Sequence, residues 1–461
     1  GAPGVGNTVL GRGEGELREF WGESRAFEIS VENRPANGDA YVFYDGPPFA
    51  NGLPHYGHLL TGYVKDVIAR YQTMRGKRVE RRFGWDCHGL PAEMAAEKEL
   101  GISGRAAIQD YGIDTFNEHC RTSVMKYTSE WEYYVKRQGR WVDFKNDYKT
   151  MDTPFMESVL WAFSELYKKG LVYESMRVMP YSWAAETPVS NFETRIDNAT
   201  REREDKAVYV KFKLKEKPKN VHDDGEFHLL AWTTTPWTLP SNLALAASSN
   251  VKYGYVTDGD AIVIASVDSL CKLYGKKETL VYQDIEAKQF LGLAYEPLFP
   301  YFVDTKNAFR VLDGGDAVTE GEGTGVVHMA SGFGEVDQQL AAANGIGVIV
   351  PVDEKGRFTD EIFDIPWCHP ERSEGSQRDS SASPQNDIML QLKGLVVVAD
   401  TRIALADITV SDEDKARHID AKDIAKYGLA NMRILRWLKA NGHLVKDEPY
   451  KHNYPHCWRT D

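Results

Sequence analysis

The sequence predicts an α/β protein in which a β-rich domain interrupts a domain built on parallel strands. Two patterns indicate this fold. Residues 41–93 read as strand, helix and strand, joined by a Gly/Pro turn, and residues 208–214 alternate strictly between apolar and polar side chains. Short strand-like pieces continue to about Pro351. At 461 residues the chain is too long for one core, so two or three domains are expected.

Helices are predicted mainly in the first domain. One spans residues 16–27, and another begins at Pro54 and ends at Gly76. The apolar face of this second helix, which we assign to the core, is Leu60, Val64, Ile68 and Tyr71. Residues 105–170 are helical in pattern, and their aromatic stripes are also assigned to the core. The last of these stripes is Phe155, Val159, Phe163 and Leu166. A single further helix is expected over residues 420–440.

Residues 369–387 are predicted to be a disordered insertion. The segment has no Phe, Tyr, Trp or β-branched side chain. It therefore buries too little apolar surface to offset the entropy lost on ordering.

Composition excludes several classes of protein. A net charge of -13 argues against sequence-independent coating of nucleic acid, although a local basic groove would suffice for one RNA partner. Candidates for that groove are Lys206 and the five lysines between Val210 and Asn220, a run that is usually the solvated face of a strand. Five scattered cysteines indicate a reducing compartment, and no apolar run approaches 18 residues. We expect a soluble, cytoplasmic protein without a membrane partner.

The first motif that carries chemistry is Gly46-Pro47-Pro48-Phe49-Ala50-Asn51-Gly52-Leu53-Pro54-His55-Tyr56-Gly57-His58. His55 and His58 lie three residues apart at a helix N-terminus, where unpaired N–H groups and the helix dipole favour a polyphosphate. Gly57, between the two histidines, has no side chain that would obstruct the flat base of a nucleotide. By itself such a histidine pair is more often surface polarity or half of a metal site, but a second motif, Gly84-Trp85-Asp86-Cys87-His88-Gly89-Leu90-Pro91, follows.

The second candidate site combines two distant segments. Residues 232–242 carry four threonines and Asn242, whose donors and acceptors do not ionise at neutral pH and suit ribose hydroxyls and an ester. Threonines alone would favour an ordinary strand and turn. Residues 323–337 add His328 and Asp337 beside glycines that let backbone approach a ligand.

Together these motifs resemble the isoleucyl-tRNA synthetases, a family of class I aminoacyl-tRNA synthetases. The resemblance covers residues 16–461 apart from 369–387. It implies the first half of a Rossmann-type class I catalytic domain, interrupted by a β-rich, β-barrel-like editing domain. The domains implied are residues 1–197, 198–453 and a return to the first domain at 454–461.

The resemblance also implies the site residues. The residues implied to bind ATP with magnesium are Asn51, His55, Gly57 and His58. In this role the two histidines are catalytic, because they stabilise charge on the phosphates. Those for isoleucine are Pro47, Pro48 and Asp86. The editing pocket comprises Thr233, Thr234, Thr235, Trp237, Asn242, His328 and the catalytic Asp337, which holds the substrate's ammonium group. Ser331 and Val336 depart from the family's usual pattern.

No zinc is predicted. Many family members hold structural zinc with two Cys-x-x-Cys pairs. Here the corresponding positions are Ser182, Ala185, Cys457 and Thr460. One thiolate of four cannot hold structural zinc.

The resemblance implies an isoleucine-tRNA ligase that uses isoleucine, ATP and the tRNA for isoleucine and hydrolyses mischarged valyl-tRNA. We find no Lys-Met-Ser-Lys-Ser-like loop and no anticodon-binding domain, and the chain lacks an initiator methionine. We therefore expect a monomeric N-terminal fragment that edits but does not aminoacylate. Alternatives are a stand-alone hydrolase of mischarged tRNA and a non-catalytic tRNA-binding paralogue. A dinucleotide-binding oxidoreductase is disfavoured, because the glycines at 11–15 do not follow a strand.

Overall fold

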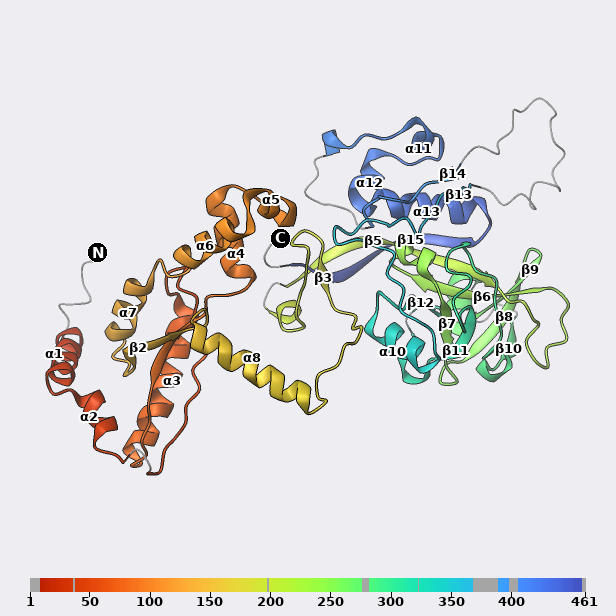
Figure 1. Ribbon diagram of the computed structural model, residues 1–461. Helices are drawn as coiled ribbons and strands as arrows, with labels where there is room; N and C mark the ends of the chain where they lie inside the picture. The colour runs from red at the N-terminus through yellow and green to blue at the C-terminus, as the bar shows by residue number, and fades with distance from the viewer. Residues whose placement is uncertain are drawn as a thin grey trace. The chain divides into compact units, whose positions relative to one another are not determined.

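The computed structural model describes residues 9–35, 38–196, 199–275, 282–321, 323–367, 389–397 and 405–457. The chain divides into two compact units, Gly1–Glu174 and Ser175–Asp461 (Figure 1). The predicted insertion at 369–387 lies outside the described residues. The boundary between the units lies before residue 197, and the predicted domain limits stay predictions.

The first unit is built on parallel strand pairing, as predicted. β1 (Arg82–Trp85) pairs in parallel with β2 (Asp143–Lys149). Two isolated parallel bridges, Ala40 to Arg78 and Phe49 to Asp86, join residues 40–49 to the segment that contains β1. The predicted first strand is represented only by these two bridges, and Pro47 and Pro48, in the turn that follows it, have no N–H to donate. The connecting helix is α3 (Tyr56–Met74).

The described part of the first unit has seven other α-helices and a small core. The helices are α1 (Val9–Glu23), α2 (Ala26–Glu32), α4 (Leu90–Leu100), α5 (Gly104–Tyr111), α6 (Ile113–Ser123), α7 (Thr128–Arg137) and α8 (Thr153–Lys168). The core contains Phe83 and Trp85 from β1 and Trp131 and Val135 from α7. The first aromatic stripe, on α7, is therefore core as predicted.

Two predicted core faces are wrong. The four apolar residues assigned to the core on α3, Leu60, Val64, Ile68 and Tyr71, are 38% to 68% exposed. α3 buries Gly62, Ala69 and Thr73 instead. α8 buries no residue, and Val159, Phe163 and Leu166 are about half exposed. The small residues of α3 allow its backbone to approach residues 138–141, where Gln138 donates to the carbonyl of Leu59 and Arg70 to that of Gly139.

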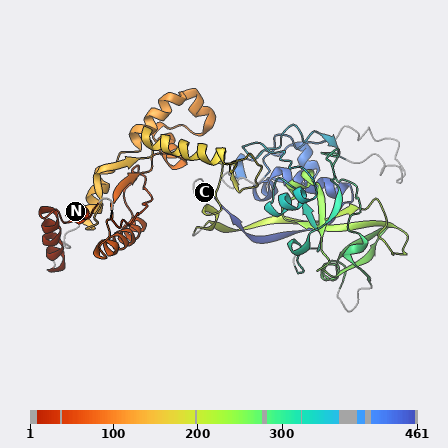
Figure 2. The same cartoon turned by 60° about the horizontal axis from the view of Figure 1, so that its bottom comes forward.

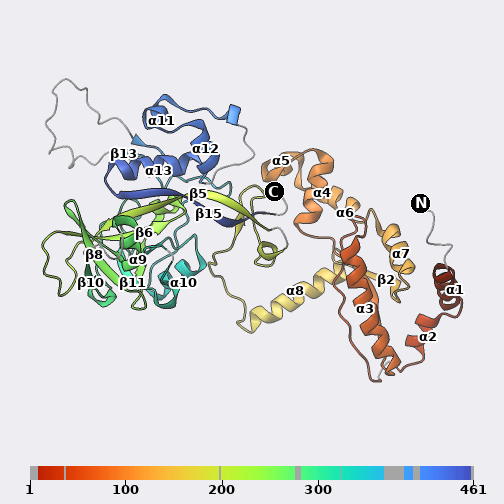
Figure 3. The ribbon, with the colours of Figure 1, turned by 180° about the vertical axis from the view of Figure 1, so that it is seen from behind.

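The second unit contains a nine-stranded mixed sheet in the order β10-β8-β9-β6-β12-β7-β11, with β5 pairing with both β6 and β15 (Figures 1 and 3). Its strands are β5 (Thr200–Lys213), β6 (Glu226–Thr233), β7 (Ala244–Ala247), β8 (Tyr253–Asp258), β9 (Ala261–Ser266), β10 (Gln283–Ile285), β11 (Arg310–Asp313), β12 (Val327–Met329) and β15 (Leu444–Pro455). Their alternate apolar side chains form the largest core of the molecule's described part. The prediction of a β-rich domain is confirmed.

The long strands β5 and β15 run side by side as an antiparallel ribbon (Figure 2). Its pairs run from Leu444 and Val210 to Pro455 and Thr200. Tyr454 and Pro455, where we predicted the chain to leave this domain, still belong to β15. Two short antiparallel strand pairs complete the sheets, β3 (Tyr181–Ser182) with β4 (Thr187–Pro188), and β13 (Ile365–Pro366) with β14 (Met389–Leu390).

Five α-helices belong to the second unit's described part: α9 (Val267–Tyr274), α10 (Glu335–Ala343), α11 (Asp412–Ala416), α12 (Ala421–Tyr427) and α13 (Leu429–Ala440). The predicted single helix over 420–440 is therefore wrong, because it is broken at Gly428, whose φ of 83° is unfavourable for other residues. Its start is correct, since the Asp420 side chain caps α12 by accepting from the N–H of Asp423.

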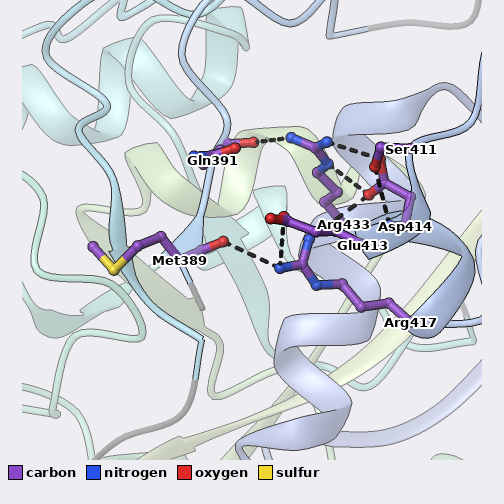
Figure 4. A network of polar contacts seen from close by, with 7 residues as sticks. All are labelled: Met389, Gln391, Ser411, Glu413, Asp414, Arg417 and Arg433. Atoms are coloured by element: carbon purple, nitrogen blue, oxygen red, sulfur yellow. Dashed lines mark hydrogen bonds and ion pairs between the residues drawn. The ribbon is translucent and has the colours of Figure 1, made fainter. Parts of the chain in front are cut away.

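Both flanks of the 369–387 segment are fixed. β13 and β14 pair across it, and Figure 4 shows the polar network beside β14. Arg433 donates to both carboxylate oxygens of the buried Asp414, at 2.9 and 2.8 Å, and to the carbonyl of Gln391 at 2.7 Å. Arg417 donates to the carbonyl of Met389 at 3.4 Å. These contacts tie the chain that follows the segment to α11 and α13.

Candidate active sites

The first candidate site is the histidine pair at the start of α3. His55 is the N-cap residue, and its Nδ1 accepts from the N–H of Gly57 at 3.1 Å. The Nδ1 of His58 accepts from the N–H of His55 at 3.2 Å. The two rings stack with centroids 3.7 Å apart, and His58 also packs edge-on against Trp131 at 4.6 Å. The sequence placed the pair correctly, in one turn at a helix N-terminus.

The backbone contacts determine which ring nitrogen carries the proton. Because Nδ1 of each ring accepts an N–H, the proton of the neutral ring lies on Nε2. Burial, then the neighbouring His55 and Lys65, lowers the pKa of His58, which favours its neutral form. Both Nε2–H groups are thus available as donors beside the positive end of the helix dipole. This arrangement suits an anion such as a phosphate.

The loop before α3 is held by the core behind it. The indole N–H of Trp131 donates to the carbonyl of Gly52 at 2.9 Å, and the N–H of Tyr127 donates to that of Ala50 at 2.9 Å. Asn51 donates its side-chain amide to the carbonyl of Pro91 at 3.2 Å, so this side chain is partly occupied in positioning α4. Gly57 is required sterically, because a Cβ there would lie 2.9 Å from Cε1 of His55.

Asp86 and the two prolines lie next to this loop. The N–H of Asp86 donates to the carbonyl of Pro48 at 2.9 Å, which fixes the proline segment beside the start of the second motif. The Asp86 carboxylate is half-buried and accepts one long contact, 3.4 Å, from the N–H of His88. Pro48 and Asp86 are therefore in contact, and Asn51, between the prolines and the histidine pair, contacts Pro91 of the second motif.

The second candidate site is a buried polar network between β6, β12 and the 3-10 helix Pro236–Ser241. His328 on β12 contacts Asn242 Nδ2 through Nδ1 at 2.7 Å and Thr238 Oγ1 through Nε2 at 3.0 Å. Asn242 Oδ1 accepts from the hydroxyl of Tyr295 at 2.6 Å. Burial lowers the pKa of His328 to about 3, so its ring is neutral at physiological pH.

Three threonines extend the network. The Thr238 hydroxyl donates to the carbonyl of Thr235 at 2.8 Å, and the hydroxyls of Thr233 and Thr235 are 3.1 Å apart. The N–H of Thr235 donates to the Thr233 hydroxyl at 3.1 Å. Thr234 is half-buried between them. Trp237 is fixed by the side chain of Asn431, which accepts from its N–H, and its ring packs on Phe333.

Asp337 joins this group through the backbone. It lies in the first turn of α10, and its Oδ2 accepts from the N–H of Ala330, two residues after His328, at 2.9 Å. Burial raises its pKa, and the Ala330 N–H partly opposes this effect. Of the departures from the family pattern, Ser331 is buried and bonded to residues 347 and 349, whereas Val336 is exposed.

A cavity of about 1230 Å³ lies beside α10 in the second unit. Its walls include Trp237 from the candidate site, Phe333 and Gln338 beside it, and Arg203 and Tyr454 from the β5–β15 ribbon. Gln338 bridges to the start of the unit: it donates to the carbonyl of Met176 at 2.8 Å and accepts from the N–H of Val178 at 2.9 Å. The residue after Asp337 therefore holds one wall of the cavity.

Sequence reasoning missed two residues of the second site. Thr238 stands in the quoted motif, and its contact with His328 shows that it belongs with the site residues. Tyr295 lies far from every motif and carried no signal. The lysines proposed as a basic groove are largely neutralised: Lys206, Lys211, Lys213 and Lys217 pair with Asp447, Asp258, Glu226 and Asp224.

The zinc positions do not suit a metal. Ser182 is buried, and its hydroxyl accepts from the N–H of Ala185, while Thr460 lies outside the described residues. Among the residues that the structure describes, no three His, Cys, Asp or Glu side chains cluster as metal ligands. The absence of zinc stays a prediction. None of the described helices has the length and apolar character needed to span a membrane.

Comparison with known proteins identifies the family. The model of the class I tRNA synthetases for I, L, M and V matches residues 16–344. The chain is 51% identical over 465 residues to an isoleucine–tRNA ligase of Rickettsia felis and 52% identical over 452 residues to that of Rickettsia canadensis. Each match covers 97% of this chain, which spans only 37% and 36% of those relatives' lengths.

Solved structures give a weaker likeness. A LeuRS–tRNA–LeuAMS complex from Agrobacterium radiobacter K84 is 17% identical, covering 73% of this chain and 43% of that one, with a TM-score of 0.29. A score this low supports no inference. The family model alone covers well over half of the chain. The chain belongs to the class I tRNA synthetases of the isoleucine, leucine, methionine and valine group.

Proposed function

We propose that this chain carries the isoleucine-activation region and the complete editing site of an isoleucine–tRNA ligase. In the ligase, the isoleucine carboxylate attacks the α-phosphate of ATP and displaces pyrophosphate, and a ribose hydroxyl of the tRNA for isoleucine then takes the isoleucyl group from this adenylate and releases AMP. The editing site hydrolyses valyl-tRNA formed in error. Two-fifths of the relatives' length is represented, so the ligation activity is assigned to the whole enzyme.

In the activation region, His55 and His58 offer two Nε2–H donors at the N-terminus of α3. We assign them to the phosphates of ATP with magnesium, where they stabilise developing negative charge. Asn51 and Gly57 shape the nucleotide site. The Asp86 carboxylate, which has one weak partner, receives the ammonium group of isoleucine, and Pro47 and Pro48 contact its side chain.

In the editing site, the ester between valine and the terminal ribose is hydrolysed. Water supplies the hydroxyl that joins the valine carbonyl carbon, and the ribose oxygen leaves with a proton. Thr233, Thr234 and Thr235 bind the ribose and the ester through groups that stay neutral, and His328 and Asn242 fix them from behind. Trp237 and Phe333 give the adjoining cavity aromatic surfaces on which bases can stack.

Asp337 carries the editing proposal. Its carboxylate is half-buried and accepts a hydrogen bond from the N–H of Ala330, although an ionised carboxylate accommodates several such bonds. An amino acid's ammonium group is the complement of such a site. A stand-alone hydrolase or a tRNA-binding paralogue would not need the activation region, and the intact backbone contacts of His55 and His58 favour the ligase over a vestigial histidine motif.

The test is hydrolysis of valyl-tRNA for isoleucine by the purified chain. Asp337→Ala removes a charge-assisted contact worth about 1.5 to 3 kcal/mol, and we expect the rate to fall about 10- to 100-fold. Glu335→Ala is the matched control, because Glu335 is an exposed acid in the same turn of α10. Equal rates for parent and Asp337→Ala would refute the assignment of Asp337, and no hydrolysis by the parent would refute editing by this chain.

A further inference from the structure

Tyr295 lies in the core of the second unit, outside the two motifs of the candidate editing site. It is fully buried, packs edge-on against Phe212 and Phe309, and its N–H donates to the carbonyl of Phe309 at 3.0 Å. Its hydroxyl donates to Asn242 Oδ1 at 2.6 Å. The ring and the backbone are therefore both fixed, so the hydroxyl has a defined position in the core.

The Asn242 amide is oriented from both ends. Its Oδ1 accepts from Tyr295, and its Nδ2 donates to the carbonyl of Ala244 at 2.9 Å, a group that can only accept. The same Nδ2 therefore faces His328 Nδ1 as a donor, at 2.7 Å. His328 Nδ1 must accept, so the single proton of the neutral ring lies on Nε2.

The same donor-to-acceptor order continues from His328 to the threonines. The Nε2–H of His328 donates to Thr238 Oγ1, whose own proton is donated to the carbonyl of Thr235. The hydroxyls of Tyr295 and Thr238 and the amide of Asn242 therefore each have one orientation in this hydrogen-bonded network. Hydrogen bonds in a buried chain of this kind polarise one another, and an unsatisfied member is costly.

We propose that Tyr295 is a positioning residue of the candidate editing site: its hydroxyl orients the Asn242 amide, which keeps His328 in the Nε2–H form and so orders Thr238 and Thr235. The tautomer part of this inference concerns the network alone, whereas its effect on hydrolysis rests on the proposed editing function. Tyr295 itself touches no substrate group in this scheme and acts only through Asn242.

The experiment removes one oxygen atom. In Tyr295→Phe, the buried Asn242 Oδ1 loses its hydrogen-bond donor. Because an unsatisfied buried acceptor is unfavourable, we expect the amide to rotate away from its position. With ¹⁵N-histidine labelling, the parent should show His328 only as the Nε2–H tautomer, a signal identified by its loss in His328→Gln. The variant should show a population protonated at Nδ1. Hydrolysis of valyl-tRNA should fall about 3- to 10-fold in kcat, with KM unchanged.

Tyr301→Phe is the matched control. Tyr301 is buried in the same core, and its hydroxyl donates at 2.7 Å to the carbonyl of Phe363, outside the network. It should leave both the His328 spectrum and kcat unchanged. The proposal is overturned, even if the chain edits, when His328 of the parent protein carries its proton on Nδ1. It is also overturned when the Tyr295→Phe variant gives the same histidine spectrum as the parent. If Tyr295→Phe changes the spectrum but the parent protein hydrolyses no valyl-tRNA, the editing function is refuted. The conclusion that Tyr295 sets the tautomer of His328 through Asn242 would then still hold.

Discussion

The two histidine sites of this chain are held in place in opposite ways. His55 and His58 are fixed by backbone N–H groups at the end of a helix, where His55 is exposed and His58 half-buried. His328 is surrounded by side chains of Asn242 and Thr238 and is almost completely buried. The first arrangement depends on local chain geometry, the second on the whole core. Changes in charge should therefore affect the second site more, and changes in backbone shape the first.

The largest expected effect concerns acid. His328 has a folded-state pKa of about 3 and an unfolded value near 6.5, so the unfolded chain binds the proton first. Above pH 6.5 His328 does not reduce the free energy of unfolding. As the pH is lowered from 6.5 to about 3, that free energy decreases by at most about 1.4 kcal/mol per pH unit. His328→Gln presents the same acceptor and donor without titrating. Urea unfolding should show a shallower loss between pH 6.5 and 4 in this variant than in the parent.

His58→Gln is the counterpart at the open site. The pKa of His58 is lowered by burial and positive neighbours, but the side chain stays partly exposed. The pH dependence of unfolding should remain close to that of the parent. If both variants changed the slope equally, burial would not distinguish the two sites.

A smaller effect is expected from backbone shape. In Gly57→Ala the new Cβ meets the His55 ring at 2.9 Å, so the ring must rotate and the cap on the Gly57 N–H is lost. Loss of an N-cap costs about 1 kcal/mol, measured as the free energy of unfolding in urea. Gly22→Ala, with open space around its Cβ, should instead stabilise its helix slightly. A Gly57→Ala variant as stable as Gly22→Ala would show that the His55 cap is unimportant.

The smallest effect is expected where neither site is involved. Replacing residues 369–387 with a short Gly/Ser linker should change thermal unfolding and editing little, since halving a loop's length alters closure entropy by only about 0.6 kcal/mol. β13, β14 and Arg433 hold the flanks independently of the segment. Arg433→Ala should be far more damaging, because it leaves Asp414 buried without its main partner. A collapse of either property in the linker variant would show that the segment contributes to the fold.

Local signals predicted the starts of helices better than the packing of their faces. Pro54 and the histidines marked the start of α3, and Asp420 marked that of α12, because caps depend on neighbouring residues. The core faces of α3 and α8 were wrong because an apolar stripe at helical spacing does not reveal which neighbour covers it. Tyr295 could not be found, since its partner Asn242 is 53 residues away and no periodic pattern joins them.

The bridge from Gln338 to Met176 and Val178 has a practical consequence for anyone who expresses the second unit alone. A recombinant protein that starts at β5, the first long strand, would omit both backbone partners of the Gln338 amide. α10 would then lose its outer tether next to Asp337, and a truncated sample could be inactive for reasons unrelated to its chemistry. Such a protein should begin no later than Ser175, where the compact unit begins.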